Sequence, residues 1–382
     1  MHAAVSSGGG VVRDRRDDCA IIGMLLLCDA ICQRIAVSRA HTASSNARAA
    51  ARAPRLVDVA RVARLSPITV SRALREPHKV SPQARARVEA AVAKTGYVRD
   101  LVASSLTSRR TRLVGLVVPT ITGSIYASTV AGLTAVLRSR GFEALIGDSG
   151  YGLAGEEKLV AAFLGRRADG IVLGNVAHTG AARRMLERAR IPVVETGNLT
   201  SDPIDMVVGF SNYDAARAMM AHVVARGHRT IGFIGAPTTD NPQAADRRRA
   251  YADAVDTHRL ASNRTLIVEC ASDLDAGGSA LLSILEANPR CTAIFAASEV
   301  RATGALLMCL RRGIDVPARI AIAGFNDAGL GAHLVPALTT VRVPREAIGR
   351  RAAQMILDRL EGHPVVEPVV DVGFEIMARE SA

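Results

Sequence analysis

Apolar residues recur at helical spacing in the stretch that begins at Leu56. They are Leu56, Val59, Ala60, Val62 and Ala63. Positions three and four apart share one face of a helix, so this spacing predicts a first short helix. A second is predicted after Ser66, because serine caps helices and Pro67 suits a first turn that needs no backbone N–H. A third is predicted from Ser81-Pro82 to Gly96, which is suited to end a helix.

The second predicted helix has an apolar side and a small polar side. Val70, Ala73 and Leu74 point inward at helical spacing. The outer face holds Pro67, Ile68, Thr69, Ser71 and Arg72. Three short helices with a tight turn between the first two predict a helix-turn-helix, whose second helix fits a DNA major groove. An ordinary three-helix bundle would show the same periodicity.

From Leu113 onward, short apolar strands alternate with helical stretches. The predicted strands include LVGLVVP, EALIGDS, GIVLGN and PVVETGN, and a helix is predicted from Ser124 to Arg140. The pattern then restarts, because Arg229–Pro237 (RTIGFIGAP) echoes Arg112–Thr120 (RLVGLVVPT). Such alternation predicts two α/β subdomains, each a doubly wound parallel sheet. Ligands bind beyond the carboxyl ends of such strands, so the cleft between the subdomains is the expected pocket.

Positive charge is concentrated around the predicted helix-turn-helix. Between Arg52 and Arg112 there are fourteen Lys or Arg against four Asp or Glu, so this segment carries most of the formal net charge of +12. Lys and Arg that neutralise phosphates gain affinity by releasing counterions, which favours a nucleic-acid partner. A solvated basic face is the other interpretation of such a charge run.

The first 53 residues are expected to be a disordered tail or to precede the true start of translation. Their flanks are rich in small residues, a composition that stays disordered. The apolar run CAIIGMLLLCDAIC is interrupted by Asp29 and is too short to span a membrane. The six cysteines form no C-x-x-C pair and lie near no histidine at metal spacing, so neither a metal site nor a disulfide framework is predicted. A reducing cytoplasm fits best.

The stretch from Leu56 to Tyr97 resembles the DNA-binding headpiece of the lactose-repressor (LacI/GalR) family. The matching positions are Asp58, Val59, Ala60, Ser66, Thr69, Val70, Ser71, Arg72, Val80, Ser81, Gly96 and Tyr97. The resemblance implies that Pro67, Ile68 and Arg72 face base edges. It also implies that Thr69, Ser71, Lys79 and Ser81 hold phosphates. Arg72 is the best suited of these to a bidentate contact with guanine.

The segment after the headpiece resembles the family's hinge helix, with Leu106 at the place of the leucine that wedges into the minor groove. One departure concerns stability. Arg64 stands where the family has a turn glycine, and an arginine with a left-handed backbone there would add strain of about 1 kcal/mol.

The resemblance continues to about Glu380 and implies the fold of a periplasmic sugar-binding protein fused to the headpiece. It implies that Arg247 clamps ligand hydroxyls or a carboxylate, and that Asn326 and Ser298 line the pocket. The stretches PTITGSIYA, LGRRADGIVL, AHTGAARRML and IPVVETGNLTSDPIDMVVGFSN more narrowly resemble the gluconate-operon repressors. This resemblance implies a sugar-acid effector such as gluconate or its phosphate. Arg247 would pair with its carboxylate, and the neutral Asn326 would avoid repelling it. Ser124, Tyr126, His178 and Asn212 are expected as secondary contacts.

The expected domains follow from these patterns. They are the tail at 1–53, the headpiece at 54–98, the hinge helix and linker at 99–111, and a bilobal effector-binding and dimerisation domain at 112–382. Two-fold symmetry would match a homodimer, or a higher oligomer, to a pseudo-palindromic operator in double-stranded DNA. The helical stretches STVAGLTAVL and AIGRRAAQMILDRLEG are candidates for the dimer interface.

The sequence thus predicts a repressor that a sugar acid releases from its operator. It contains no G-x-x-x-x-G-K-[ST] phosphate-binding loop, no G-x-S-x-G elbow and no H-E-x-x-H motif, so neither an enzyme nor a cofactor is predicted. Two alternatives stay open. An exported sugar-binding transport component would need a working signal peptide, and an α/β enzyme acting on a sugar would turn its ligand over. The basic headpiece argues against both.

Overall fold

The computed structural model describes residues 52–98, 110–121 and 125–382. These divide into two compact units, Met1–Asp100 and Leu101–Ala382, called here the headpiece and the core. The predicted hinge residue Leu106 and the predicted pocket residue Ser124 lie outside the described residues. No helix in the described ranges is both long enough and apolar enough to cross a membrane.

Residues 52–98, the described part of the headpiece, form three α-helices and one 3-10 turn. They are α2 (Leu56–Ala63), α3 (Pro67–Arg75), η1 (Pro77–Lys79) and α4 (Pro82–Thr95). The Ser66 hydroxyl accepts the backbone N–H of Thr69 at the start of α3, and Gly96 ends α4 with a φ of 64°. Val59, Val70 and Val88, one from each helix, meet in the small core. The predicted helix-turn-helix is confirmed.

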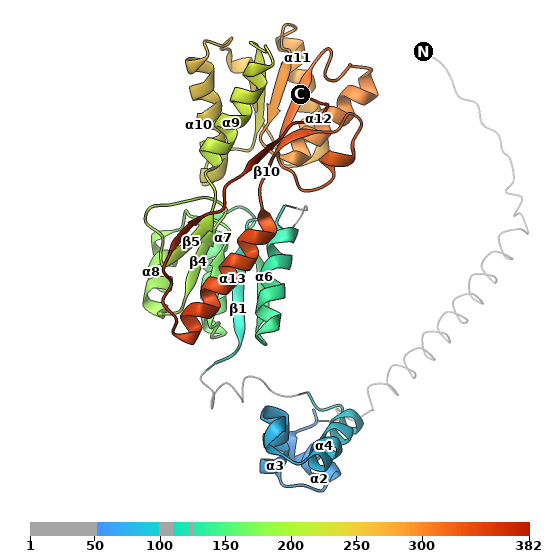
Figure 1. The fold of residues 1–382 in the computed structure, drawn as a ribbon, viewed down its shortest axis with the longest axis vertical. Coiled ribbons are helices and arrows are strands. Elements are labelled where there is room, and N and C mark those ends of the chain that lie inside the picture. The colour runs from blue at the N-terminus through green and yellow to red at the C-terminus, as the bar shows by residue number, and fades with distance from the viewer. Residues whose placement is uncertain (1–51, 99–109, 122–124) are drawn as a thin grey trace, which may run out of the picture. The chain divides into compact units, whose positions relative to one another are not determined.

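The core contains two lobes, each built on a six-stranded sheet (Figure 1). The first sheet has the order β11-β5-β4-β3-β1-β2, and its strands pair in parallel. Its strands are β1 (Leu113–Val118), β2 (Glu143–Asp148), β3 (Gly170–Leu173), β4 (Val193–Thr196), β5 (Met206–Gly209) and β11 (Val369–Asp371). The helices of this lobe are α6 (Ala127–Ser139), α7 (Leu153–Gly165), α8 (Gly180–Ala189) and α13 (Arg345–Glu361).

The second lobe repeats the first. Its sheet has the order β12-β10-β9-β8-β6-β7, in which only β12 is antiparallel to its neighbour. Its strands are β6 (Ile231–Gly235), β7 (Ile267–Glu269), β8 (Ala293–Ala296), β9 (Ala321–Asn326), β10 (Thr339–Arg342) and β12 (Glu375–Met377). Its helices are α9 (Asn212–Ala225), α10 (Pro242–Thr257), α11 (Leu274–Ala287) and α12 (Glu299–Arg312), with short turns η2 (Arg264–Leu266) and η3 (Gly331–His333). Because β1 and β6 hold the same place in the two sheets, the predicted repeat is confirmed.

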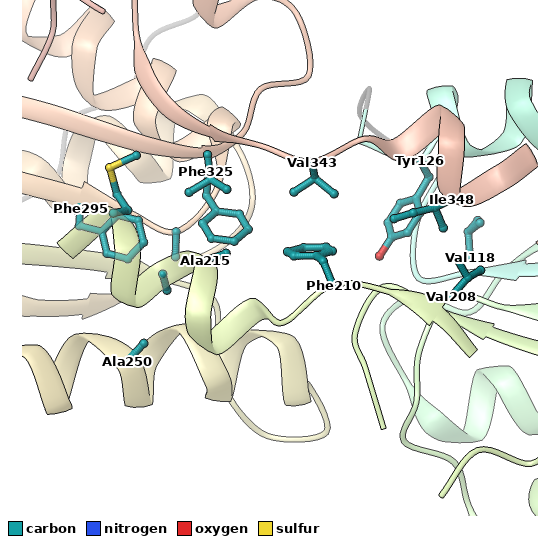
Figure 2. Packing of buried hydrophobic residues seen from close by; sticks show 14 of the residues in the cluster. Val118, Tyr126, Val208, Phe210, Ala215, Ala250, Phe295, Phe325, Val343 and Ile348 are labelled. Atoms are coloured by element: carbon teal, nitrogen blue, oxygen red, sulfur yellow. The ribbon is translucent and has the colours of Figure 1, made fainter. Parts of the chain in front are cut away.

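The chain crosses between the lobes at three places. Phe210 lies on the crossing from β5 to α9, Val343 on that from β10 to α13, and residues 372–374 join β11 to β12. Figure 2 shows Phe210 and Val343 between the buried residues of the two lobes, with Phe325 on one side and Tyr126 on the other. One apolar cluster therefore runs through the crossings from one lobe to the other.

Helices α6 and α13 lie side by side on the first sheet (Figure 1). They approach closely at two glycines. A Cβ added at Gly132 would lie 2.2 Å from the carbonyl oxygen of Glu346, and one at Gly349 would lie 2.0 Å from that of Thr129. These helices contain the two stretches expected at a dimer interface, and each buries one face against the other within the chain. The predicted helix also begins at Ala127 rather than at Ser124.

Candidate functional site

The first candidate surface is the outer face of α3. Pro67, Ile68 and Arg72 are exposed, and the Ile68 side chain is 72% accessible. Thr69 and Ser71 are half-buried beside them. An isoleucine this exposed, next to an exposed arginine, is suited to contact a thymine methyl group and a guanine edge. The structure thus places the predicted base-contacting residues together on one accessible face.

The residues expected to hold phosphates flank this face. Lys79 is exposed and forms an exposed ion pair with Glu76 at 3.1 Å, which the stronger field of a phosphate could replace. Ser81 is exposed, and its hydroxyl accepts the backbone N–H of Ala84 at the start of α4. The geometry leaves both side chains accessible to a polyanion.

The turn between α2 and α3 carries the predicted strain. Arg64 has φ 52° and ψ 47°, which is the left-handed region that glycine adopts most easily. The Arg87 guanidinium donates to the carbonyl oxygens of Ala63 and, at 3.0 Å, of Arg64. Arg87 therefore fixes the turn from α4 and offsets part of its cost.

The second candidate site is the cleft between the lobes. Arg247 on α10 is buried, with 7% of its surface exposed. Its Nε and Nη2 donate to Oδ1 of Asn212 at 2.9 and 2.7 Å, and its Nη1 donates to the carbonyl oxygen of Ala297 at 2.8 Å. The guanidinium carbon lies 4.0 Å from the centre of the Phe325 ring. All of these partners are neutral, so the charge of Arg247 is held in place without being neutralised.

Several side chains connect the two lobes around Arg247. The Asn212 side chain donates to the carbonyl oxygen of Gly197 at 2.7 Å, and Gln243 donates to that of Gly174 at 3.3 Å. Asn198 donates to a carboxylate oxygen of Asp246 at 2.7 Å. Gly197 has φ 92°, and a Cβ there would lie 2.6 Å from the Gln243 amide nitrogen. Glycine at this position lets the lobes approach.

Asn326 is held by an arginine that the sequence analysis did not identify. Arg345, at the start of α13, donates to Oδ1 of Asn326 at 2.7 Å and lies 5.8 Å from the Tyr126 ring. Burial raises the pKa of Tyr126 to about 12, and the positive Arg345 partly opposes this effect. Asn326, at the end of β9, also has φ 103°, which is a rarely populated backbone conformation.

Ser298 is hydrogen-bonded to Arg301, a second arginine that the sequence did not point to. Its hydroxyl accepts Nη1 of Arg301 at 3.0 Å, and Arg301 also donates to the carbonyl oxygen of Cys270 at 2.8 Å. Glu299, next in the chain, accepts the backbone N–H groups of Ala328 and Gly331. Its carboxylate therefore fixes the loop after β9 and takes no part in binding these arginines.

The structure places the His178 side chain in a buried group with two carboxylates of the first lobe. Its Nδ1 lies 2.5 Å from Oε1 of Glu156, and its Nε2 lies 3.1 Å from Oε1 of Glu195. Burial alone would lower the pKa of His178, but the two carboxylates raise it to about 9. Both ring nitrogens are engaged, so His178 supports the first lobe.

The cleft contains two hollows. One of about 20 Å³ lies between Tyr151 and Asn175 of the first lobe and Asp240 and Gln243 of the second. Another of about 320 Å³, partly open to solvent, is lined by Asn326 and Arg345. Across the described ranges, no group of three or more His, Cys, Asp or Glu is arranged to hold a metal ion. The site is suited to bind a small polar molecule.

The sequence predicted five of the residues described above as contacts in this cleft, namely Arg247, Asn212, Asn326, Tyr126 and Ser298. It missed Arg301 and Arg345, which are both buried. Each lies in the first turn of a helix that follows a strand, since α12 follows β8 and α13 follows β10. Ligands of such folds bind at the carboxyl ends of the strands. An arginine at such a position is the signal that could have identified them.

Comparison with known proteins agrees with both units. Residues 55–100 match the profile described as "Bacterial regulatory proteins, lacI family", and residues 220–382 match that of a periplasmic binding protein-like domain. The HTH-type transcriptional regulator GntR of Pseudomonas aeruginosa is 37% identical over 330 residues, which cover 86% of this chain and 95% of that protein.

Solved structures show the same similarity. A LacI-family transcriptional regulator from Silicibacter pomeroyi superposes with a TM-score of 0.79 at 31% identity and covers 86% of this chain and 99% of its own. The regulator CelR in complex with cellobiose has a TM-score of 0.62 at 30% identity, covering 86% and 100%. With its helix-turn-helix headpiece and bilobal core, the chain belongs to the lacI family of bacterial transcriptional regulators.

Proposed function

We propose that this regulator is a repressor whose operator binding is released by a small sugar acid, such as gluconate or its phosphate. The observation that carries the proposal is the buried guanidinium of Arg247, which lies between the lobes and has only neutral partners. A buried cation without a counter-charge is costly, and a carboxylate bound by its planar fork would remove that cost. CelR, a relative of the same fold, is known in complex with a sugar, cellobiose.

In the headpiece, Pro67, Ile68 and Arg72 would read base edges. Thr69, Ser71, Lys79 and Ser81 would position the helix on phosphates, and Leu106 would wedge into the minor groove. The exposure of the α3 face supports the first of these roles. A homodimer would place two such helices on a pseudo-palindromic operator.

In the core, Arg247 would bind the carboxylate, with Asn212, Asn326, Tyr126 and Ser298 around it. His178 is left out of the proposed site because Glu156 and Glu195 occupy its ring nitrogens. The neutral amide of Asn326 would accept or donate to ligand hydroxyls without repelling the acid.

The bonds between the lobes suggest how ligand binding reaches the DNA. The contacts Asn198 to Asp246 and Gln243 to Gly174 exist only when the lobes are close. A ligand that pairs with Arg247 would favour this closed arrangement. If the closed arrangement disfavours ordered hinge helices, operator affinity falls.

The proposal is tested by fluorescence anisotropy with DNA from upstream of the protein's own gene, at a stated salt concentration, with and without gluconate and 6-phosphogluconate. We expect tight, sequence-dependent binding that one of these acids weakens. Arg247→Gln should still bind DNA but lose the response, while Arg311→Gln, an exposed arginine on α12, should respond normally. Specific binding untouched by either acid would overturn the effector assignment, and an absence of specific binding would overturn the repressor.

A further inference from the structure

An exposed arginine precedes each of four neighbouring strands at the amino edge of the first sheet. Arg112 comes directly before β1, and Arg140, Arg167 and Arg190 come three residues before β2, β3 and β4. These strands are adjacent in the order β4-β3-β1-β2, and the pairing of Leu113 with Glu143 brings the starts of β1 and β2 level. A second exposed arginine precedes three of them, at Arg138, Arg166 and Arg188. The amino edge therefore carries a row of positive charge.

Most of this charge is not neutralised within the chain. Arg140 pairs with Glu361 at 2.7 Å. In the part of the chain that the structure describes, no carboxylate pairs with the side chain of Arg112, Arg167 or Arg190. Because all of these guanidinium groups belong to exposed residues, they are accessible to a polyanion.

The three arginines without a counter-charge also have an unfavourable backbone. The φ values of Arg112, Arg167 and Arg190 are 58°, 56° and 53°. Glycine adopts this left-handed region without strain, and asparagine adopts it more readily than arginine does. Backbone preference therefore does not explain why arginine occupies these turns.

The chain that comes from the headpiece enters the core at this same edge. The carboxylate of Asp169, directly before β3, accepts the backbone N–H groups of Thr111 and Arg112 at 3.2 and 2.6 Å. The Thr111 hydroxyl donates to the carbonyl oxygen of Arg167 at 2.7 Å. Only residues 99–109 join this anchored point to the described headpiece, and a chain of that length spans at most about 40 Å. DNA held by the headpiece is therefore tethered within reach of the arginines.

We propose that this row of arginines binds the phosphate backbone of the DNA beside the half-site that the headpiece contacts. Neighbouring strands lie about 4.8 Å apart, so the four strand starts span roughly 14 Å, which is about four base-pair steps of a duplex. Guanidinium groups bind phosphates through paired hydrogen bonds and release counterions as they do so. Because phosphates carry no base information, these contacts add affinity without sequence preference.

The second lobe offers a matched control surface. The amino edge of its sheet also carries exposed arginines, among them Arg259 before β7 and Arg290 before β8. Arg259 has φ 50°, so its backbone matches that of the first-lobe arginines. Both sheets direct their carboxyl ends toward the cleft, so the two amino edges lie at opposite ends of the core (Figure 1). The headpiece is joined to the first of these edges.

The salt dependence of DNA binding by the full chain tests the proposal. The probes are a long duplex from upstream of the protein's own gene and a duplex of equal length and arbitrary sequence. Arg167→Gln combined with Arg190→Gln should weaken binding of both duplexes by a similar factor, at least threefold at low salt. The slope of log affinity against log salt should become shallower by about 2, since each phosphate contact contributes about 0.9. Arg259→Gln combined with Arg290→Gln should leave affinity and slope at their wild-type values.

Conservative variants separate charge from structure. Arg167→Lys combined with Arg190→Lys keeps both charges and should retain the wild-type slope, which a purely structural role of the arginines would not produce. An unchanged slope in the first-lobe glutamine variant would overturn the proposal and leave this edge to an acidic protein partner. Equal losses in the first-lobe and second-lobe glutamine variants would assign the effect to overall charge, which would also overturn it.

Discussion

At the residue scale, the proposed base contacts depend on a few exposed side chains of the headpiece. Arg72 is exposed on α3 next to Ile68, above the buried Val70 and Ala73. Arg72→Ala should therefore leave the fold intact and relax base preference at one operator position, at a cost of about 1–3 kcal/mol for the preferred base. Binding to a panel of operators with single-base changes measures this. An unchanged preference at every position would contradict the assigned role.

Arg64 adopts a backbone conformation that is unfavourable for arginine. Its left-handed backbone is supported by Arg87 from α4. Arg64→Gly should raise the unfolding free energy of the headpiece by about 1 kcal/mol, because glycine has no Cβ to strain. Thermal unfolding of the full chain, followed by headpiece hydrogen exchange, provides the measurement. Arg61→Gly, within α2, should have the opposite sign, since there the glycine only weakens a helix.

His178 makes the stability of the first lobe depend on pH. Burial lowers its pKa, but Glu156 and Glu195 raise it to about 9 from an ordinary 6.5. The stabilisation is therefore complete below pH 6.5 and is lost as pH rises through about 9. Across that window wild type should lose about 3 kcal/mol relative to His178→Gln. Denaturant unfolding at pH 6 and pH 9.5 checks it, with the exposed His363→Gln as control. Equal slopes in wild type and His178→Gln would contradict the pairing.

At the scale of elements, the sequence predicts a helix or strand wherever that segment has its own cap or apolar pattern. The headpiece helices α3 and α4 start at Ser-Pro caps, and β1 and β6 have similar apolar runs. The four-residue strands β5 and β10 and the three-residue β11 and β12 carry no comparable pattern. The sequence also does not show that α13 and β11 return to the first lobe. This return depends on contacts between residues more than a hundred positions apart.

The same limit applied to the cleft. Arg247 could be predicted because a family motif surrounds it. Arg301 and Arg345 could not be predicted, because they lie on separate helices and approach Arg247 only in the folded chain. The neutral acceptors around them also come from other parts of the sequence. Ser298 and His178 were placed near the pocket, but the partners that occupy them, Arg301 and two glutamates, come from elsewhere in the chain.

The crossing of α6 and α13 depends on two glycines. A Cβ at Gly349 would lie 2.0 Å from a carbonyl oxygen of Thr129, so Gly349→Ala forces these helices apart. Such overpacking costs about 1–3 kcal/mol, which thermal unfolding of the core should show. Gly165→Ala at the end of α7, where a Cβ meets nothing within 4 Å, is the matched control and should be neutral. Unchanged stability in Gly349→Ala would mean the helices can shift freely.

For the whole molecule, the proposed switch requires that operator and effector oppose each other. Asn198 and Asp246 join the lobes in the closed arrangement, and an effector bound at Arg247 adds to the same closure. Linkage then requires that the factor by which effector weakens operator binding equals the factor by which operator weakens effector binding. Calorimetry of effector with free protein and with the operator complex gives the second factor, and anisotropy gives the first.

The same linkage predicts the effect of loosening the closed lobes. Asp246→Ala removes the bond from Asn198, so the closed arrangement becomes less populated and effector affinity should fall about three- to tenfold. Intrinsic operator affinity should stay the same or rise, because in the proposed switch the open arrangement is the one that binds DNA. Asp214→Ala, which removes only an exposed ion pair with Arg217, should change neither affinity. If Asp246→Ala weakened operator and effector binding together, the two ligands would favour the same arrangement, and closure of the cleft could not be what releases the DNA.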